Sequence, residues 1–240
     1  MENINDYEVQ IKIAKIAQNV LNELNQDIRA RFTRWFHLRP TSKNITIVTT
    51  HPSRPMRGIS VGRTVVKDAI LFIVNCCDES SNEVNWDRIA ERYNAGKGFE
   101  VGFANTESPF QADMINHMSN NRNLKKMLGV QNIYFNASEV VFARGYEKRS
   151  IIDVVAHDNG GKVFLFELKS PENNTDDPVK QVTEYLEVYG KGGPKNQVFE
   201  KMMANYPQNP IKEITDFTGY GVVGYSECPE LIGEMLIVCT

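Results

Sequence analysis

The chain has 240 residues and a formal net charge of −3, from 27 Lys and Arg against 30 Asp and Glu; 41% of its residues are apolar and 24% are charged. This composition is ordinary for a soluble globular protein and excludes a disordered tail, a collagen-like fibre and a disulfide-stapled miniprotein. No apolar run approaches the roughly 20 residues that span a bilayer, and the first residues lack the basic start and apolar core of a signal peptide.

The cysteines and histidines do not form a metal-binding or disulfide pattern. Two of the four cysteines are adjacent, no C-x-x-C pair occurs, and the four histidines are far apart in the sequence. We therefore expect neither a zinc site nor a disulfide framework. Together with the missing targeting signals, this favours a reducing, intracellular location, which we take to be cytoplasmic. The cysteines are Cys76, Cys77, Cys228 and Cys239.

The first half of the chain predicts a small α/β region. Apolar residues recur at helical spacing over 7–36 without internal Pro or Gly, and Pro40 follows the end of this run. The β-branched and apolar segments 44–50 and 69–76 predict strands, and 86–93 predicts a short helix. Turn-forming residues around 105–109 predict a boundary, so we divide the chain into an accessory region over 1–105 and a second domain over 106–240.

The second half predicts the order helix, three strands, helix, strand. Gly129 would end the first helix, Asp158-Asn159-Gly160-Gly161 is typical of a hairpin turn, and Asp177-Pro178 combines an N-cap acid with Pro at the first helical position. The predicted helices are 110–128, 178–189 and 197–206, and the predicted strands are 138–143, 150–157, 162–169 and 221–225.

Charged residues end one of these apolar strands. Side chains alternate along a strand, so Glu167 and Lys169 lie on one face, and the hairpin turn returns the strand that carries Asp153 alongside them. Charge at the end of a strand that is apolar on both faces is costly unless it is used. Two carboxylates that meet there suit Mg²⁺ or Mn²⁺, and a neighbouring Lys suits a phosphate or a metal-bound water. These parts fit metal-assisted phosphodiester hydrolysis.

These residues resemble a known signature. Asp153, followed after thirteen residues by Glu167-Leu168-Lys169, is similar to the D…E-x-K motif of the PD-(D/E)xK nucleases, the restriction-endonuclease-like superfamily, and the predicted element order is similar to the core of that superfamily. Gln181 and Tyr185 form a Q-x-x-x-Y pair on one helix face, as in the RecB-type branch. The resemblance covers about 109–225, and Ile152 stands where many members have Pro.

The resemblance implies a restriction-endonuclease-like core, of the order αβββαβ, with a mixed central sheet flanked by helices. It also implies that Asp153 and Glu167 bind Mg²⁺ or Mn²⁺, with the Leu168 carbonyl as a further ligand, and that Lys169 positions the attacking water or the scissile phosphate. Gln181 and Tyr185 would support the site. Some members use an acid from the first helix; Asp113 is our candidate for it, and Glu139 is the second.

A basic stretch precedes this domain. Between residues 29 and 67 there are nine Lys and Arg and no Asp or Glu, with aromatic residues among the first of them. Such a stretch predicts a surface that binds phosphates, although a solvated basic face with a buried Trp35 explains it equally well. The candidates for nucleic-acid contacts are Arg29, Arg31, Arg34, Trp35, Arg39, Lys43, Arg54 and Arg57, together with Arg149, which resembles the basic residue that often precedes the motif aspartate.

We therefore expect an α/β, Mg²⁺-dependent deoxyribonuclease, and favour an endonuclease over an exonuclease and DNA over RNA. One alternative is a nucleic-acid-binding module on the same fold that no longer cuts, and another is an unrelated α/β interaction protein. If the fold is a different one, Glu167 and Lys169 are edge charges and Asp153 is a turn residue. Independently of this, Tyr185 could be a core residue of an amphipathic helix. No membrane partner is expected, and the sequence leaves homodimerisation open.

Overall fold

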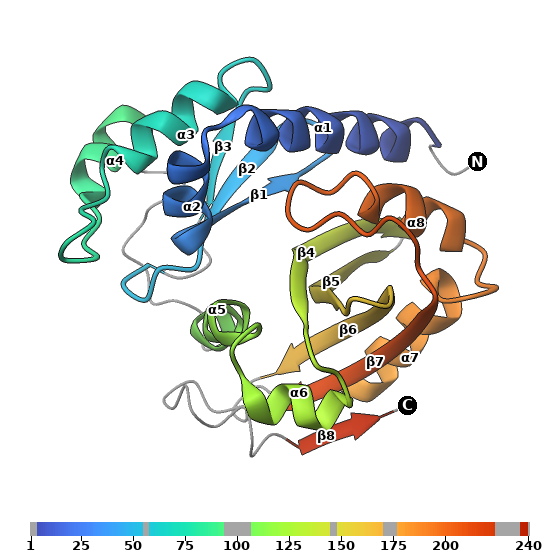
Figure 1. Ribbon diagram of the computed structural model, residues 1–240. Helices are drawn as coiled ribbons and strands as arrows, with labels where there is room; N and C mark the ends of the chain where they lie inside the picture. Colours follow the sequence, from blue (N-terminus) through green and yellow to red (C-terminus); the bar gives the residue numbers. More distant parts are fainter. Residues whose placement is uncertain are drawn as a thin grey trace.

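The computed structural model describes residues 4–54, 58–93, 107–144, 148–169, 177–223 and 236–239, which form a mixed α/β structure around two sheets (Figure 1). The first sheet contains three strands and the second contains five. No helix in the described ranges is long and apolar enough to cross a membrane. The boundary that we predict at residues 105 and 106 lies outside the described residues.

The N-terminal region packs helices against a three-stranded antiparallel sheet, with strands in the order β1-β2-β3. Its core is continuous and includes Phe32, Leu38 and Ile70, all fully buried. The elements are α1 (Ile4–Glu23), α2 (Gln26–Trp35), β1 (Phe36–Pro40), β2 (Ile45–Thr49), β3 (Gly58–Val61), α3 (Val66–Val74) and α4 (Trp86–Tyr93).

Two predictions for this region were wrong. The single helix over 7–36 is two helices, because the Asn25 side chain caps a new helix by accepting from the Ile28 N–H at 2.8 Å. The segment 69–76 is mostly helix α3, not a strand. A short apolar run fits either structure, and here tertiary packing decides: one helical face buries Val66, Ile70 and Ile73 against the core. Strands β1 and β3 were not predicted.

The C-terminal part builds a mixed sheet with strands in the order β4-β5-β6-β7-β8, in which β6 and β7 are parallel and the other neighbours are antiparallel. The strands are β4 (Tyr134–Arg144), β5 (Lys148–His157), β6 (Lys162–Lys169), β7 (Asp216–Val223) and β8 (Leu236–Cys239). The helices are α5 (Glu107–His117), α6 (Arg122–Leu128), α7 (Pro178–Tyr189) and α8 (Asn196–Met203).

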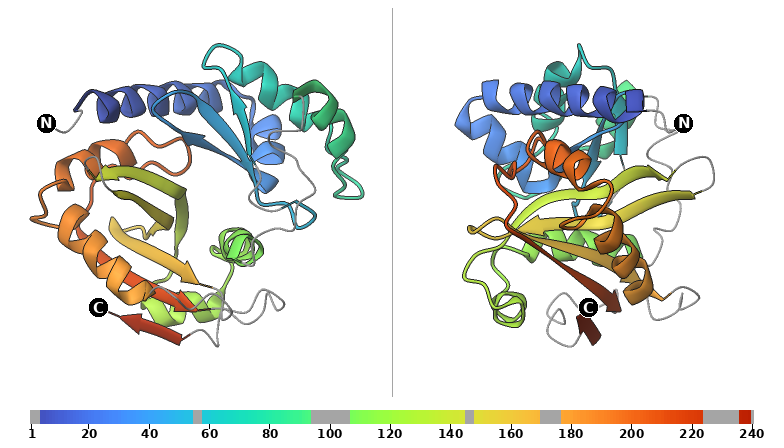
Figure 2. Two further views of the ribbon diagram at one scale, coloured as in Figure 1. Left: turned by 180° about the vertical axis from the view of Figure 1, so that it is seen from behind. Right: turned by 90° about the vertical axis from the view of Figure 1, so that its right-hand side faces the viewer.

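Helices cover both faces of this sheet (Figure 2). Val163 and Leu165 of β6 pack with residues of α7 and α8, whereas Phe164 and Phe166 pack with residues of α5 and α6. The predicted helix over 110–128 is interrupted, because Asn121 caps α6; Gly129 ends α6 with φ 69, as predicted. Asp177 caps α7 and Pro178 opens it, also as predicted. Strand β8 was not predicted.

Helix α7 lies very close to β7 because two positions of β7 lack side chains. A Cβ atom on Gly219 would lie 2.2 Å from Cγ1 of Val182, and one on Gly221 would lie 2.8 Å from the backbone N of Val179. Gly221 pairs with Glu167 across the parallel ladder. The first turn of α7 is therefore placed directly beside the charged end of β6.

Polar contacts join the two sheets. His37 of β1 is hydrogen-bonded through Nε2 to the Ser138 hydroxyl of β4 at 2.7 Å, and Arg39 forms an ion pair with Glu139. The Gln208 side-chain amide bonds to both backbone groups of Leu38: its nitrogen donates to the Leu38 carbonyl at 3.1 Å, and its oxygen accepts from the Leu38 N–H at 2.6 Å. The accessory region is thus docked on the second sheet by buried polar groups.

The close packing of α7 on β7 predicts that a methyl group added at Gly219 lowers the stability of the protein. Gly219→Ala should lower the free energy of unfolding by about 1–3 kcal/mol, because the stiff Val182 side chain cannot move aside. Combining it with Val182→Ala should cost less than the sum of the two single substitutions, because the second change opens room for the first. Urea denaturation of the four proteins measures this coupling.

Gly62→Ala is the matched control, because a Cβ there would meet only Cγ2 of Val65, at an ordinary 3.7 Å. It should change stability by less than about 0.5 kcal/mol. Strict additivity of the Gly219 and Val182 substitutions would contradict the packing described.

His37 predicts a pH dependence of stability. Burial, and to a smaller degree the neighbouring Arg39, lowers the pKa of His37 from 6.5 to about 3. Between these values the unfolded chain binds a proton that the folded protein does not, so stability falls as the pH falls below 6.5, by at most about 1.4 kcal/mol per pH unit. Urea unfolding between pH 7 and pH 5 should show a shallower loss for His37→Gln than for the unaltered protein. His117→Gln, at a side chain that is 57% exposed, should keep the full slope.

Candidate active site at the end of strand β6

The Asp153 carboxylate replaces a backbone group at the place where β5 and β6 separate. The β5–β6 ladder ends at the pair Val154–Phe166, and Asp153 and Glu167 are the next residues beyond this last pair. Oδ2 of Asp153 accepts a hydrogen bond from the Leu168 N–H at 2.7 Å. A buried backbone N–H needs such a partner, so this bond fixes the carboxylate at the end of β6.

Strand β5 is irregular at Asp153. Ile152 and Val155 both pack in the core cluster under α7 and α8, whereas Val154 packs in the cluster under α5 and α6. Strict alternation would place Ile152 and Val155 on opposite faces, so the strand departs from it here. On β4 the facing residue, Glu139, has φ 44, between the regular pairs Ser138–Val154 and Val140–Ile152. Such a distortion redirects a side chain away from its regular position.

Glu167 and Lys169 form a largely buried ion pair. Nζ of Lys169 lies 2.9 Å from Oε1 of Glu167, and their side chains are 14% and 5% exposed. Removing two charges from water is costly, and their mutual attraction offsets only part of that cost. The predicted carboxylates and lysine are therefore brought together at one end of the sheet, which is the arrangement that we expected from the sequence.

Helix α7 contributes to the same place. The Tyr185 hydroxyl lies 2.7 Å from the Ile151 carbonyl oxygen, to which it donates, and 3.4 Å from Oε2 of Glu167, so it links α7 to β5 and β6. Gln181 lies one turn earlier on α7, and its Oε1 atom is buried without a hydrogen-bond partner among the described residues. A buried amide oxygen without a partner is costly, and such groups are often satisfied by a water or an ion.

One site residue was missed. Gln111 of α5, which is 5% exposed, donates from Nε2 to the Asp153 carbonyl at 2.6 Å, and so holds the backbone of the aspartate. We had expected the first helix to contribute an acid, and a buried amide carries no charge signature in the sequence. A polar residue next to the apolar Phe110 and Ala112 was the only available indication.

The two candidate acids have other partners. Asp113 lies 3.3 Å from Nε2 of His117 on the same helix; burial raises the pKa of Asp113, while His117 lowers it. Glu139 is paired with Arg39. On α5 it is Gln111, two residues before Asp113, that contacts the Asp153 backbone.

Some residues of the basic stretch have partners within the protein. Arg31 forms an ion pair with Glu79 and donates to the Val74 and Cys77 carbonyls, and Arg39 is engaged by Glu139, so both serve the fold. Trp35 is partly buried against the core, with the Arg34 guanidinium 5.3 Å from its ring centre.

The other basic candidates are spread over several elements. Lys43 is exposed after β1, Arg29 is exposed on α2, and the Arg54 guanidinium lies 5.7 Å from the ring centre of Trp86. Arg57 lies outside the described residues. Arg149 is in β5 opposite Ala143, and its side chain is not among those described.

The chemistry of the donor set decides which metal the site suits. Among the described residues no group of three or more His, Cys, Asp or Glu side chains could hold a metal ion. Asp153 and Glu167 are two carboxylates, whereas a zinc site needs three or four protein groups. The pair fits Mg²⁺, which binds one or two carboxylates and keeps several waters. Leu168 contacts Asp153 through its N–H. The role of its carbonyl as a further metal ligand stays a prediction.

Comparison with known proteins adds no assignment: no protein-family model matches the chain, and neither a curated protein nor a solved structure matches it.

Proposed function

We propose that the chain is a metal-dependent nuclease that hydrolyses phosphodiester bonds in DNA. The observation that carries this proposal is the meeting of Asp153, Glu167 and Lys169 at the end of β6, inside a largely buried environment. Further support comes from the element order helices, three strands, helices, strand, which is similar to the core of the PD-(D/E)xK superfamily. In this proposal the C-terminal part is the nuclease domain.

Asp153 and Glu167 would hold Mg²⁺ or Mn²⁺. When bound, such an ion lowers the pKa of a coordinated water and offsets negative charge on the phosphate in the transition state. The Leu168 N–H keeps the Asp153 carboxylate in place, Gln111 holds the Asp153 backbone, and the Glu167 carboxylate is paired with Lys169. This preorganisation favours catalysis because little rearrangement is needed during the reaction.

Lys169 would be the cation of the reaction. In the present structure its ammonium group is paired with Glu167. A phosphate that enters the site would compete for this ammonium group, and Lys169 would then stabilise the charge on the phosphate or orient the attacking water. Tyr185 would act as a positioning residue, because it bonds to β5 and lies beside Glu167. The buried Oε1 of Gln181 would accept a hydrogen bond from a water in the site.

Substitution of the three charged residues tests the reaction. Asp153→Asn, Glu167→Gln and Lys169→Met should each lower Mg²⁺-dependent cleavage of DNA at least a hundredfold, because each removes a proposed metal ligand or the cation proposed to stabilise the phosphate. Cleavage is measured on circular and linear DNA, single- and double-stranded, with Mg²⁺ and with EDTA. Cutting of circular DNA would identify an endonuclease.

Lys162→Met is the matched control, since Lys162 lies at the opposite end of β6 and contacts Phe164. It should retain full activity, as should Asp113→Asn if Asp113 serves only its pair with His117. Full activity of purified, folded Lys169→Met would refute the proposed reaction. Binding of DNA without cleavage under all conditions would favour the alternative, a binding module that no longer cuts.

Metal binding can be measured without activity. Mg²⁺ should raise the melting temperature of the unaltered protein, because an ion that binds only the folded state stabilises it, by about 2.7 kcal/mol at a hundred times its Kd. Asp153→Asn and Glu167→Gln should melt at a temperature that Mg²⁺ does not change, while Asp113→Asn should respond like the unaltered protein. An equal response in all four proteins would place the metal elsewhere.

A further inference from the structure

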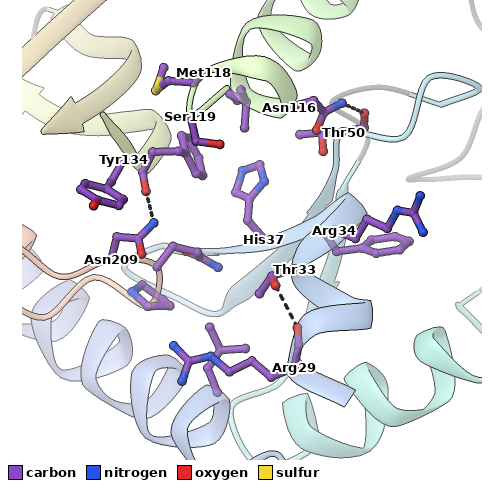
Figure 3. Close-up of a pocket in the computed structure, with 16 residues that line it drawn as sticks. Arg29, Thr33, Arg34, His37, Thr50, Asn116, Met118, Ser119, Tyr134 and Asn209 are labelled. Atoms are coloured by element: carbon purple, nitrogen blue, oxygen red, sulfur yellow. Dashed lines mark hydrogen bonds between the residues drawn. The ribbon is translucent and has the colours of Figure 1, made fainter. Parts of the chain in front are cut away.

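A second candidate site lies between the two sheets. A cavity of about 520 Å³ separates α2 and β1 from the end of α5, the start of β4 and the loop after α8 (Figure 3). This volume is in the usual range for small-molecule sites. None of the residues proposed to bind metal lines it. The cavity is therefore distinct from the end of β6.

The cavity and the proposed metal site have no residue in common. Tyr134, which lines the cavity, pairs with His157 of β5, four residues or about 13 Å along the strand from Asp153. His37, another lining residue, is hydrogen-bonded to Ser138, which pairs with Val154.

The lining combines aromatic rings with groups that can form hydrogen bonds. Phe36, His37, Tyr134 and Phe135 contribute rings, and the His37 and Phe135 rings meet edge to face with centres 5.1 Å apart. Polar groups come from Thr50, Asn116, Ser119 and Asn209. The amides of Asn116 and Asn209 each donate to a backbone carbonyl, which fixes their orientation. Rings with fixed amides and hydroxyls suit a planar polar base.

The charge on the lining is positive. Arg29 and Arg34 of α2 line the cavity, and the lining includes no Asp or Glu. Neither arginine forms an ion pair with a described residue: Arg29 donates to the Asn22 amide oxygen at 3.4 Å, and Arg34 lies over Trp35. Figure 3 shows the two side chains extending to opposite sides, with Thr33 between them. His37 adds no charge at neutral pH, because burial keeps it unprotonated.

We infer that this cavity binds a nucleotide unit, with the base among the aromatic rings and the phosphate at one of the two arginines. The inference does not require nuclease activity. The same chemistry is offered by a free mononucleotide and by a nucleotide within a nucleic-acid strand. Because guanidinium groups bind phosphate through charge-assisted hydrogen bonds, the arginines should supply most of the affinity and the rings the preference for a base.

The test measures binding to the full chain in EDTA, so that no cleavage interferes. The probes are the four common nucleoside 5′-monophosphates, the matching nucleosides, inorganic phosphate and a twelve-residue single-stranded oligonucleotide, each titrated by calorimetry. A monophosphate should bind at least tenfold more tightly than its nucleoside or inorganic phosphate. Arg29→Gln or Arg34→Gln should weaken this binding at least tenfold, as should Ser119→Phe, which fills the cavity without changing charge.

Controls separate this site from general attraction. Arg63→Gln removes an exposed arginine outside the cavity and should bind as the unaltered protein does. Binding of the oligonucleotide alone, lost in Ser119→Phe, would identify a strand as the source of the nucleotide. Absence of binding by every probe, or binding that Ser119→Phe and both arginine substitutions leave unchanged, would overturn the inference.

Discussion

The close approach of helix α7 to strand β7 is the contact on which the candidate active site depends. Gly219 and Gly221 leave room for the first turns of α7, and Gly221 is the neighbour of Glu167 in the next strand. Only this spacing lets the Tyr185 hydroxyl reach both β5 and the Glu167 carboxylate. A side chain at either glycine would lift the helix away from the sheet and separate these groups.

The charged groups are held at a position where the sheet itself is irregular. Asp153 uses its side chain to satisfy the Leu168 N–H where the ladder ends, and Glu139 opposite has a positive φ. Irregular backbone and buried charge both lower stability, and proteins retain such features where a site uses them. This physical cost adds to the support that the meeting of Asp153, Glu167 and Lys169 gives to the proposed site at the end of β6.

Some basic residues of the accessory region contribute to the fold itself. Arg31 and Arg39 bind carbonyls and acids of the protein, and His37, buried and neutral, is hydrogen-bonded to Ser138 on the second sheet. Basic residues in an acid-free stretch therefore partly serve to dock one sheet on the other. Two arginines of this stretch, Arg29 and Arg34, line the cavity between the sheets, where they can contact a ligand.

The sequence by itself determined two features. One is the set of helices and strands that begin or end at capping and turn residues, and the other is the pair of strands that brings Asp153 close to Glu167 and Lys169. Caps at Asp177 and Gly129, the turn at 158–161 and alternation along β6 are local, so they were predictable. Only the tertiary structure decided that 69–76 is helical, that Gln111 and not Asp113 supports Asp153, and that Arg39 pairs with Glu139. These outcomes depend on which faces pack together across long separations in the chain, and no local pattern encodes that choice.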